Sequence, residues 1–295
     1  MNWSRDLATW SLSHLSRRIT VGAQTWHVQE TGDGPLVLLL HGAGASVHTW
    51  RGIIPALAES ARAVAIDLPG HGFSGRAAPG RAGLDAMTLA LTRLLEDRGW
   101  RPEAILAHSA GAALGLRLAA RLGVPRLVGV NPALAPFGGV AGWLFPALAR
   151  LLVLNPLTVP LFTMGTSPAR TRRLIEGTGS RLDDDGLAFY TRLMADRDHV
   201  AGTLAMMADW RLDPLIAEMP RLDTRALFLS GARDRAVPPV TARDAAAAMP
   251  RARVESLAGL GHLAHEEDPD AVLRRALDHL LGRAETLDRS APSGG

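Results

Sequence analysis

A short apolar run that ends in a serine between small residues constrains the fold of this chain most. The run Ala104-Ile105-Leu106-Ala107 leads into His108-Ser109-Ala110-Gly111, and an Ala- and Leu-rich pattern follows. This is the form x-S-x-G of a nucleophile elbow, a sharp turn from strand to helix that strains the serine and needs small neighbours. Gly111 meets this need fully, whereas Ala107 stands where glycine is more usual. A serine among small residues is more often an ordinary helix start, so the elbow depends on what the rest of the chain supplies.

The composition allows one large α/β domain or a core with an inserted cap. The chain has 295 residues, 47% of them hydrophobic, so a substantial core can be buried. A net charge of +3 and evenly spread arginines argue against nucleic-acid binding. The lack of cysteine excludes disulfides and cysteine-ligated metals, and it fits a cytoplasmic protein. No secretory signal or clean membrane span is evident, and we expect neither a metal nor a cofactor.

Apolar runs alternate with helical patterns along most of the chain, which predicts parallel βαβ units. Continuous apolar runs indicate strands that are buried on both faces of a parallel sheet. A hairpin over 19–29 precedes them. The predicted strands are 36–40, 63–66, 104–107, 126–130, 226–230 and 253–257, and the predicted helices are 47–59, 84–98, 110–122, 240–249 and 269–284.

The alternation stops between residues 133 and 220, where the chain is mostly helical, has many prolines and shows no clear strand. We therefore expect a core made of 1–132 and 221–288, an inserted helical cap over 133–220 and a disordered tail over 289–295. The fold class is α/β, a mostly parallel sheet flanked by helices.

A serine hydroxyl becomes a useful nucleophile when a base takes its proton and a carboxylate orients that base. Asp234 directly follows strand 226–230, and His262 directly follows strand 253–257. Both residues are therefore expected at the carboxyl edge of the sheet, where Ser109 also lies and where α/β proteins place their sites. We predict Ser109 as the nucleophile, His262 as the base and Asp234 as the orienting acid.

Other residues compete for two of these roles. Asp223 and Asp213 are rival acids, but they precede the strand and would lie near its wrong end or in the cap. His265 is a rival base, flanked by Glu266 and Glu267, and its pattern is more typical of a surface residue at a helix start. These positions favour Asp234 and His262.

Acyl transfer also needs two donors for the negative charge that develops on the carbonyl oxygen. The backbone N–H of Ala110 is one candidate, and that of Ala43, in the loop after His41-Gly42, is the other. The glycine-rich loop lacks the spacing and the lysine of the phosphate-binding motifs, which argues against a phosphate site. His41 and His108 precede turns and are expected to be hydrogen-bonded structural residues.

The most apolar stretch of the chain is 143–162, and Arg150 and three prolines within it argue against a membrane span. We expect a cap face that closes over the site, with a monotopic membrane contact as the alternative. Either favours a large, apolar, poorly soluble ligand. Candidate pocket residues are His41, His108, Trp143, Phe145, Met164 and Met206, although the methionines also suit packing within a helical core.

Five motifs occur in a fixed order along the chain. They are His41-Gly42, Asp67-Leu68-Pro69-Gly70-His71-Gly72-Phe73-Ser74, the elbow around Ser109, Gly231-Ala232-Arg233-Asp234 and Gly261-His262. With them the chain resembles the α/β-hydrolase superfamily over about its whole length. The resemblance implies the α/β-hydrolase fold and a serine hydrolase.

Six further stretches carry a closer resemblance. They are 1–6, 26–29, 41–51, 108–113, 234–239 and 262–267. In these stretches the chain is similar to the magnesium-chelatase accessory proteins of bacteriochlorophyll synthesis, a family of α/β-hydrolases from phototrophic bacteria. The resemblance implies work near magnesium insertion into protoporphyrin, contact with magnesium chelatase, and a place in the cytoplasm or at the periphery of the inner or photosynthetic membrane.

Which bond is cut, if any, stays open at this point. One hypothesis is ester hydrolysis of an apolar substrate such as a porphyrin ester. The other is a non-catalytic accessory protein that binds porphyrin for magnesium chelatase. Perhydrolase or C–C hydrolase chemistry without a cofactor is a third alternative, since this scaffold hosts several reactions.

Overall fold

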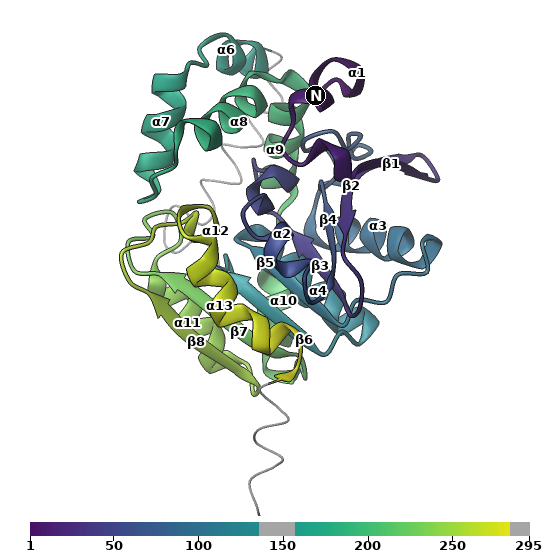
Figure 1. Ribbon diagram of the computed structural model, residues 1–295, viewed down its shortest axis with the longest axis vertical. Coiled ribbons are helices and arrows are strands. Elements are labelled where there is room, and N and C mark those ends of the chain that lie inside the picture. Colours follow the sequence, from purple (N-terminus) through teal and green to yellow (C-terminus); the bar gives the residue numbers. More distant parts are fainter. Residues whose placement is uncertain (136–156, 284–295) are drawn as a thin grey trace, which may run out of the picture.

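The computed structural model describes residues 1–135 and 157–283, and within them eight strands form one sheet in the order β1-β2-β4-β3-β5-β6-β7-β8 (Figure 1). β2 pairs antiparallel with β1 and with β4, and all other neighbours run parallel. The mostly parallel sheet predicted from the sequence is confirmed. The strands are β1 (Ser16–Val21), β2 (Gln24–Thr31), β3 (Leu36–Leu40), β4 (Arg62–Ile66), β5 (Ala104–His108), β6 (Arg126–Val130), β7 (Arg225–Gly231) and β8 (Ala252–Leu257).

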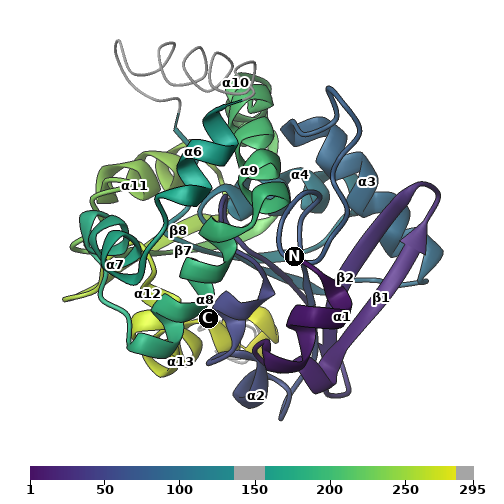
Figure 2. The same ribbon diagram turned by 90° about the horizontal axis from the view of Figure 1, so that it is seen from above.

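Helices cover both faces of the sheet, and the strand side chains alternate between two hydrophobic clusters. In β3, Leu38 and Leu40 belong to one cluster, while Val37 and Leu39 belong to the other. Burial on both faces is why these strands read as continuous apolar runs in the sequence. The first cluster packs against α3 (Leu84–Asp97), α4 (Ala110–Leu122) and α11 (Pro239–Ala248), and the second against α2 (Ile54–Leu57) and α13 (Pro269–Leu280). Seen from above, the β1–β2 hairpin forms one edge of the molecule (Figure 2).

The helix predicted over 47–59 is wrong in its extent. The chain instead forms a 3₁₀ turn at Val47–Trp50 and the short helix α2. Pro55 lies in the first turn of α2, which is where a helix tolerates proline, because proline has no N–H to donate to the preceding turn. One long helix through this proline is therefore excluded, and the turn and α2 are separate elements.

Four helices lie over the carboxyl ends of the strands: α6 (Thr158–Met164), α7 (Pro168–Gly177), α8 (Asp184–Ala195) and α9 (Arg197–Asp209) (Figure 1). Their contacts fall on the loops that follow those strand ends. Tyr190 of α8 donates to Glu266 at 2.7 Å, and the Arg235 amide donates to the Thr178 carbonyl at 3.0 Å. We propose that α6 to α9 are the described part of the predicted cap.

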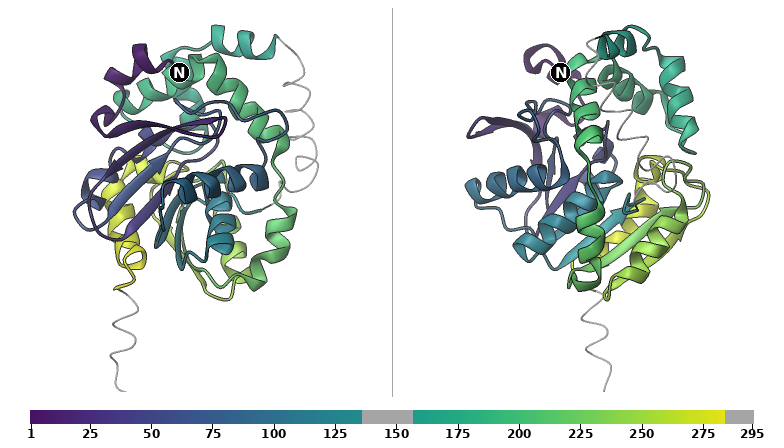
Figure 3. Two further views of the ribbon diagram at one scale, coloured as in Figure 1. Left: turned by 90° about the vertical axis from the view of Figure 1, so that its right-hand side faces the viewer. Right: turned by 180° about the vertical axis from the view of Figure 1, so that it is seen from behind.

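The end of the segment 133–220 packs differently from its beginning. Leu215 of α10 (Asp213–Glu218) and the following Met219 lie in the first core cluster, and Glu218 forms an ion pair with Arg117 of α4. Figure 3 shows the chain descending from α9 to α10 beside the sheet layers. From this packing we propose that α10 belongs with the core. The predicted tail, 289–295, lies outside the described residues.

The N-terminal residues pack on the domain. Trp10 lies in a small cluster with Phe73 and Leu193, and the guanidinium of Arg192 stacks 4.9 Å from the Trp10 ring. The N-terminal amine pairs with Asp196 at 2.9 Å. In the described ranges, none of the helices combines the length and apolarity that a membrane span requires.

Candidate active site

Ser109 stands at the turn between β5 and α4 in a strained backbone conformation, with φ 51° and ψ −119°. Residues other than glycine rarely adopt this region, and they persist there when the surrounding structure holds them. Gly111 is required because a Cβ at this position would lie 2.5 Å from the Leu40 carbonyl oxygen and 2.6 Å from that of His41. Ala107 is fully buried within β5. These features make an elbow that turns Ser109 out of the sheet.

The structure brings Ser109, His262 and Asp234 together from three separate strand ends. His262 Nε2 lies 3.1 Å from Ser109 Oγ, and His262 Nδ1 lies 2.8 Å from Asp234 Oδ2. The other carboxylate oxygen, Oδ1, accepts from the backbone amides of Ala236 and Val237, both at 2.8 Å. With its carboxylate buried and fixed, Asp234 can hold the His262 tautomer in which Nε2 accepts the serine proton.

The loop after β3 passes directly beside the serine. A Cβ on Gly42 would lie 3.0 Å from Ser109 Cβ, so the backbone that leads to Ala43 approaches the nucleophile closely. The loop ends at Val47, whose amide donates to Asp67 Oδ1 at 2.7 Å. The Ala110 amide lies at the start of α4, where helix N–H groups have no partner within the helix. The roles of Ala43 and Ala110 as oxyanion donors stay predictions.

Asp67 is a buried carboxylate that binds both the loop after β3 and the loop after β4. His27 Nδ1 lies 2.6 Å from Asp67 Oδ2, and the Phe73 amide donates to the same oxygen at 2.8 Å. Burial alone would raise the pKa of Asp67, but the interactions with His27 and His41 and the hydrogen bond from the Phe73 amide together outweigh burial and lower this pKa to about 2. Asp67 is therefore ionised at neutral pH and acts as a structural acceptor.

The His108 ring contacts the rings of His262 and His265, both in tilted orientations. The His108 ring lies 4.8 Å from that of His262 and 4.4 Å from that of His265. His108 Nε2 donates to the His262 carbonyl at 2.9 Å. Burial lowers the pKa of His108 and of His265 well below the ordinary value, so both rings are neutral near pH 7. The expectation that His265 is a surface residue is wrong: it is fully buried, with Nε2 2.6 Å from Thr49 Oγ1.

The other candidate pocket residues have different surroundings. His41 is buried, with Nδ1 donating to the Gly42 carbonyl and Nε2 accepting from the Leu68 amide, so it is the hydrogen-bonded residue expected. Met206 packs in the first core cluster, which is the alternative that the sequence left open, whereas Met164 is 78% exposed on α6. Trp143 and Phe145 lie outside the described residues.

Asn131 was not singled out by sequence reasoning, although its side chain joins the end of β6 to the end of β7 and to the loop after β8 that carries His262. It follows β6 with φ 46°, a conformation that asparagine tolerates better than most residues. Its Oδ1 accepts from the Gly231 amide at 2.6 Å, and its Nδ2 donates to the carbonyls of Gly261 and His262 at 2.9 and 2.7 Å. The only signal in the sequence is an asparagine before a proline at the end of a strand, where the backbone can require the positive φ that asparagine tolerates.

Replacement of Asn131 by alanine is expected to lower the free energy of unfolding by about 3 kcal/mol, because buried backbone groups lose their partners. Urea denaturation would measure this loss. Asn2→Ala is the matched control, since Asn2 caps the exposed helix α1 (Trp3–Asp6), and a loss of at most about 1 kcal/mol is expected there. Equal stability of Asn131→Ala and the wild type would contradict the proposed bracing of the site by Asn131.

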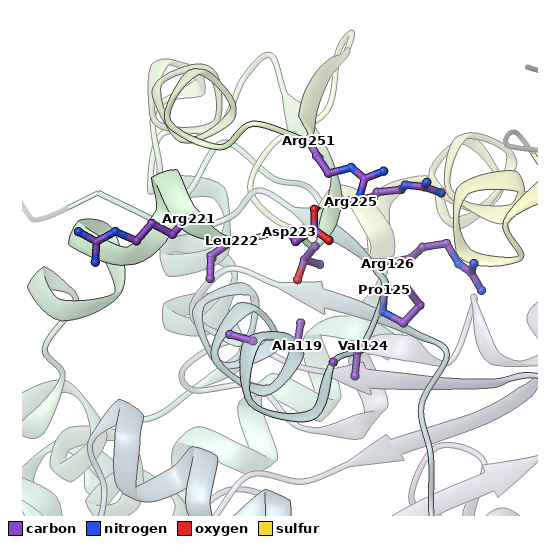
Figure 4. A pocket seen from close by; sticks show the side chains of 12 residues that line it. Ala119, Val124, Pro125, Arg126, Arg221, Leu222, Asp223, Arg225 and Arg251 are labelled. Atoms are coloured by element: carbon purple, nitrogen blue, oxygen red, sulfur yellow. Dashed lines mark hydrogen bonds and ion pairs between the residues drawn. The ribbon is translucent and has the colours of Figure 1, made fainter.

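A second polar region lies at the opposite edge of the sheet, where β6, β7 and β8 begin. A cavity of about 500 Å³ is lined there by arginines together with Asp223, which pairs with Arg251 at 2.9 Å (Figure 4). Its arginines are Arg126, Arg221, Arg225 and Arg251. None of Ser109, Asp234 and His262 lines it. Among the described residues, no cluster of three or more histidine and carboxylate side chains is arranged to hold a metal ion.

Comparisons with known proteins show which families and folds the chain is similar to. The family described as alpha/beta hydrolase fold matches residues 35–269. The chain is 44% identical to the magnesium-chelatase 30 kDa subunit of Rhodobacter capsulatus, over 93% of this chain and 98% of that protein. It is 28% identical to a pimeloyl-[acyl-carrier protein] methyl ester esterase of Xanthomonas axonopodis, over 84% and 97%. A solved α/β hydrolase fold protein of Burkholderia ambifaria is similar with a TM-score of 0.74 and 25% identity, over 90% and 97%.

Proposed function

Because the chain belongs to the α/β-hydrolase fold family, we propose that it is a serine hydrolase that cleaves an ester of a large, apolar substrate. The observation that carries this proposal is the arrangement of Ser109, His262 and Asp234, with contacts of 3.1 and 2.8 Å between successive members. The strained turn at Ser109 supports it further, because strain of this kind gathers at functional sites.

The proposed reaction has two stages. Ser109 Oγ attacks the ester carbonyl carbon while His262 Nε2 takes the serine proton, and the amides of Ala43 and Ala110 hold the negative oxygen. The intermediate collapses to an acyl-serine, and His262 returns the proton to the departing alcohol. Water then attacks the acyl-serine with His262 as base, which releases the acid and restores Ser109. Asp234 orients His262 throughout.

We infer the biological setting from the relative in Rhodobacter capsulatus, which is named as a subunit of magnesium chelatase. The proposed role lies in bacteriochlorophyll synthesis near the magnesium chelatase step, with a porphyrin ester as the substrate and contact with the chelatase. Leu157, Leu161 and Met164 are exposed at spacings of four and three residues along α6. Such a stripe on one helix face supports a peripheral membrane contact through these helices.

A serine-directed fluorophosphonate probe tests the catalytic proposal. The folded wild type is expected to become labelled, and Ser109→Ala is expected to lose the label. Ser4→Ala is the control, because Ser4 is an exposed serine in α1 and its replacement should leave labelling unchanged. Absence of label on folded wild-type protein would contradict the proposal.

The second candidate is a non-catalytic accessory protein that binds porphyrin. The observation that favours it is the name of the 44% identical relative, which is a chelatase subunit. It predicts an absorbance shift of added protoporphyrin that persists in Ser109→Ala, together with no fluorophosphonate labelling. A phototroph that carries Ser109→Ala in place of the wild type separates the two candidates further. Normal pigments would count against catalysis, and an accumulated precursor would support it.

A further inference from the structure

We propose that His199 of α9 is a positioning residue that fixes the loop supplying the second oxyanion donor. This loop, 42–46, is called the oxyanion loop below. The inference rests on the proposed function. It assigns a role to a residue that lies outside the predicted triad, on one of the helices above the sheet. The hydrogen bond that carries the inference joins α9, a helix of the proposed cap, to a loop of the core. The two bonded residues lie 155 positions apart in the chain.

Both ring nitrogens of His199 bind backbone groups of the core. The Gly72 amide lies 3.1 Å from His199 Nδ1, and the Gly44 carbonyl oxygen lies 3.2 Å from His199 Nε2. An amide can only donate, so Nδ1 accepts, and the proton of the neutral ring is therefore on Nε2, which donates to Gly44. One imidazole thereby joins the oxyanion loop to the loop after β4.

His199 is held in the neutral form that this bonding requires. It is 3% exposed, and burial lowers its pKa to about 4. The ring also packs edge-on against His71 at 5.3 Å. A protonated ring would present a donor at Nδ1 to the donating Gly72 amide. At neutral pH the tautomer and the orientation of His199 are therefore set by its surroundings.

The start of α9 is fixed in place, so His199 can act as an anchor. The His199 amide donates to Asp196 Oδ1 at 2.9 Å, which caps the helix. Gly202, one turn further on, meets the backbone of Gly70 so closely that a Cβ on Gly70 would lie 2.9 Å from Gly202 Cα. Only glycine permits this approach of a helix to a loop. These contacts anchor the first turns of α9 to the core.

Three side chains hold the oxyanion loop from the core and from α9, and one of them is His41, whose Nδ1 donates to the Gly42 carbonyl at 2.8 Å. Asp67 binds the amide of Val47 just beyond its end, and His199 binds the carbonyl of Gly44, the residue directly after Ala43. The Ala43 N–H belongs to the Gly42–Ala43 peptide, two peptide units before the Gly44 carbonyl. We infer that a shift of the Gly44 carbonyl is passed back along the loop and misdirects the Ala43 N–H. Because oxyanion stabilisation depends on donor geometry in the transition state, the loss should appear in kcat more than in KM.

Two substitutions separate the two hydrogen bonds. The terminal group of His199→Gln reaches as far as Nε2 and can donate to Gly44, whereas that of His199→Asn reaches only as far as Nδ1 and can accept from Gly72. With p-nitrophenyl butyrate as the probe, we expect kcat of His199→Gln within about threefold of the wild type. We expect His199→Asn to lose about tenfold or more in kcat, with KM changed less than about threefold.

Asp198→Asn is the matched control on the same helix. It removes the exposed ion pair of Asp198 with Arg76, another contact of α9 with the core, and leaves the bonds of His199 in place. Its kcat should equal that of the wild type. Equal losses in the asparagine and glutamine variants, or unchanged kcat in both, would overturn the proposal.

Amide hydrogen exchange keeps this test separate from the proposed function. In His199→Asn the peptide covering 42–46 should exchange faster, and in His199→Gln the faster exchange should fall at Gly72 instead. If the wild type hydrolyses no ester and takes no fluorophosphonate, the serine hydrolase proposal fails, and exchange still decides the role of His199. Unchanged exchange over 42–46 in folded His199→Asn would overturn that role.

Discussion

The Asp234→Asn variant is expected to keep its fold and to lose about 10⁴-fold in the rate of acylation at Ser109. The two backbone amides of Ala236 and Val237 require an acceptor, so the carboxamide oxygen will face them. Its NH₂ group then meets His262 Nδ1, which must become an acceptor. The His262 proton moves to Nε2, and this nitrogen can no longer take the proton of Ser109.

Stopped-flow or discontinuous labelling with the fluorophosphonate probe would measure this rate, and thermal unfolding would check the fold. Asp223→Asn is the control, because Asp223 was the rival acid and its carboxylate is 88% exposed and paired with Arg251. Wild-type rates are expected for it. A rate of Asp234→Asn within tenfold of the wild type would show that His262 does not depend on Asp234 for its tautomer.

The free energy of unfolding is expected to fall steeply as the pH drops below about 6.5. Burial holds the pKa values of several histidines below the ordinary value. Below about pH 6.5 the unfolded chain therefore binds more protons than the folded chain, which lowers the free energy of unfolding. Their contribution is fully present above pH 6.5 and is lost as the pH falls toward each folded-state pKa. These residues are His48, His71, His108, His199 and His265.

His199 alone gives the scale of this effect. Lowering its pKa from 6.5 to about 4 corresponds to about 3 kcal/mol, lost between those two pH values. A domain is stable by about 5 to 15 kcal/mol, so a few such groups suffice to unfold it in mild acid. Asp67 contributes to stability down to a lower pH. Its pKa is about 2 in the folded chain and 3.8 in the unfolded chain, so its contribution is lost only as the pH falls from 3.8 to about 2.

Urea midpoints at pH 8, 7, 6 and 5 test this expectation. The midpoints at pH 8 and 7 should be similar, and those at pH 6 and 5 should be progressively lower. His199→Gln removes one titrating group and should flatten the dependence between pH 6 and 5. Constant midpoints from pH 7 to pH 5 would contradict the assignment of these histidines as neutral buried groups.

The strands and the loops that follow them could be read from the sequence, because each signal is local. A run such as 36–40 is apolar throughout because both faces of its strand are covered, and the structure has a strand with the same bounds. The prediction of one helix over 47–59 is wrong because Pro55 has no N–H to donate within a continuous helix, so the chain forms a 3₁₀ turn and a separate short helix.

The roles of Asn131, His199 and His265 could not be predicted in the same way. An Asn-Pro strand end, a histidine on an Ala-rich helix and a histidine beside two glutamates have no local signature of burial. Each is defined by partners far along the chain, such as Gly231 for Asn131 and Thr49 for His265. Sequence spacing carries no information about which side chain a distant loop will bury.

By itself, the sequence determined the order of strands and helices, the elbow at Ser109 and the placement of Asp234 and His262 after their strands. It did so because chain direction in a parallel sheet sends every strand end to one edge. Only the tertiary structure decided the 3.1 and 2.8 Å contacts that join the three residues. It also decided the hydrogen bond between His199 of α9 and Gly44 of the oxyanion loop. Hydrogen bonds between distant segments form only when packing fixes both partners, and the physical cause of that packing is the burial of two apolar sheet faces at once.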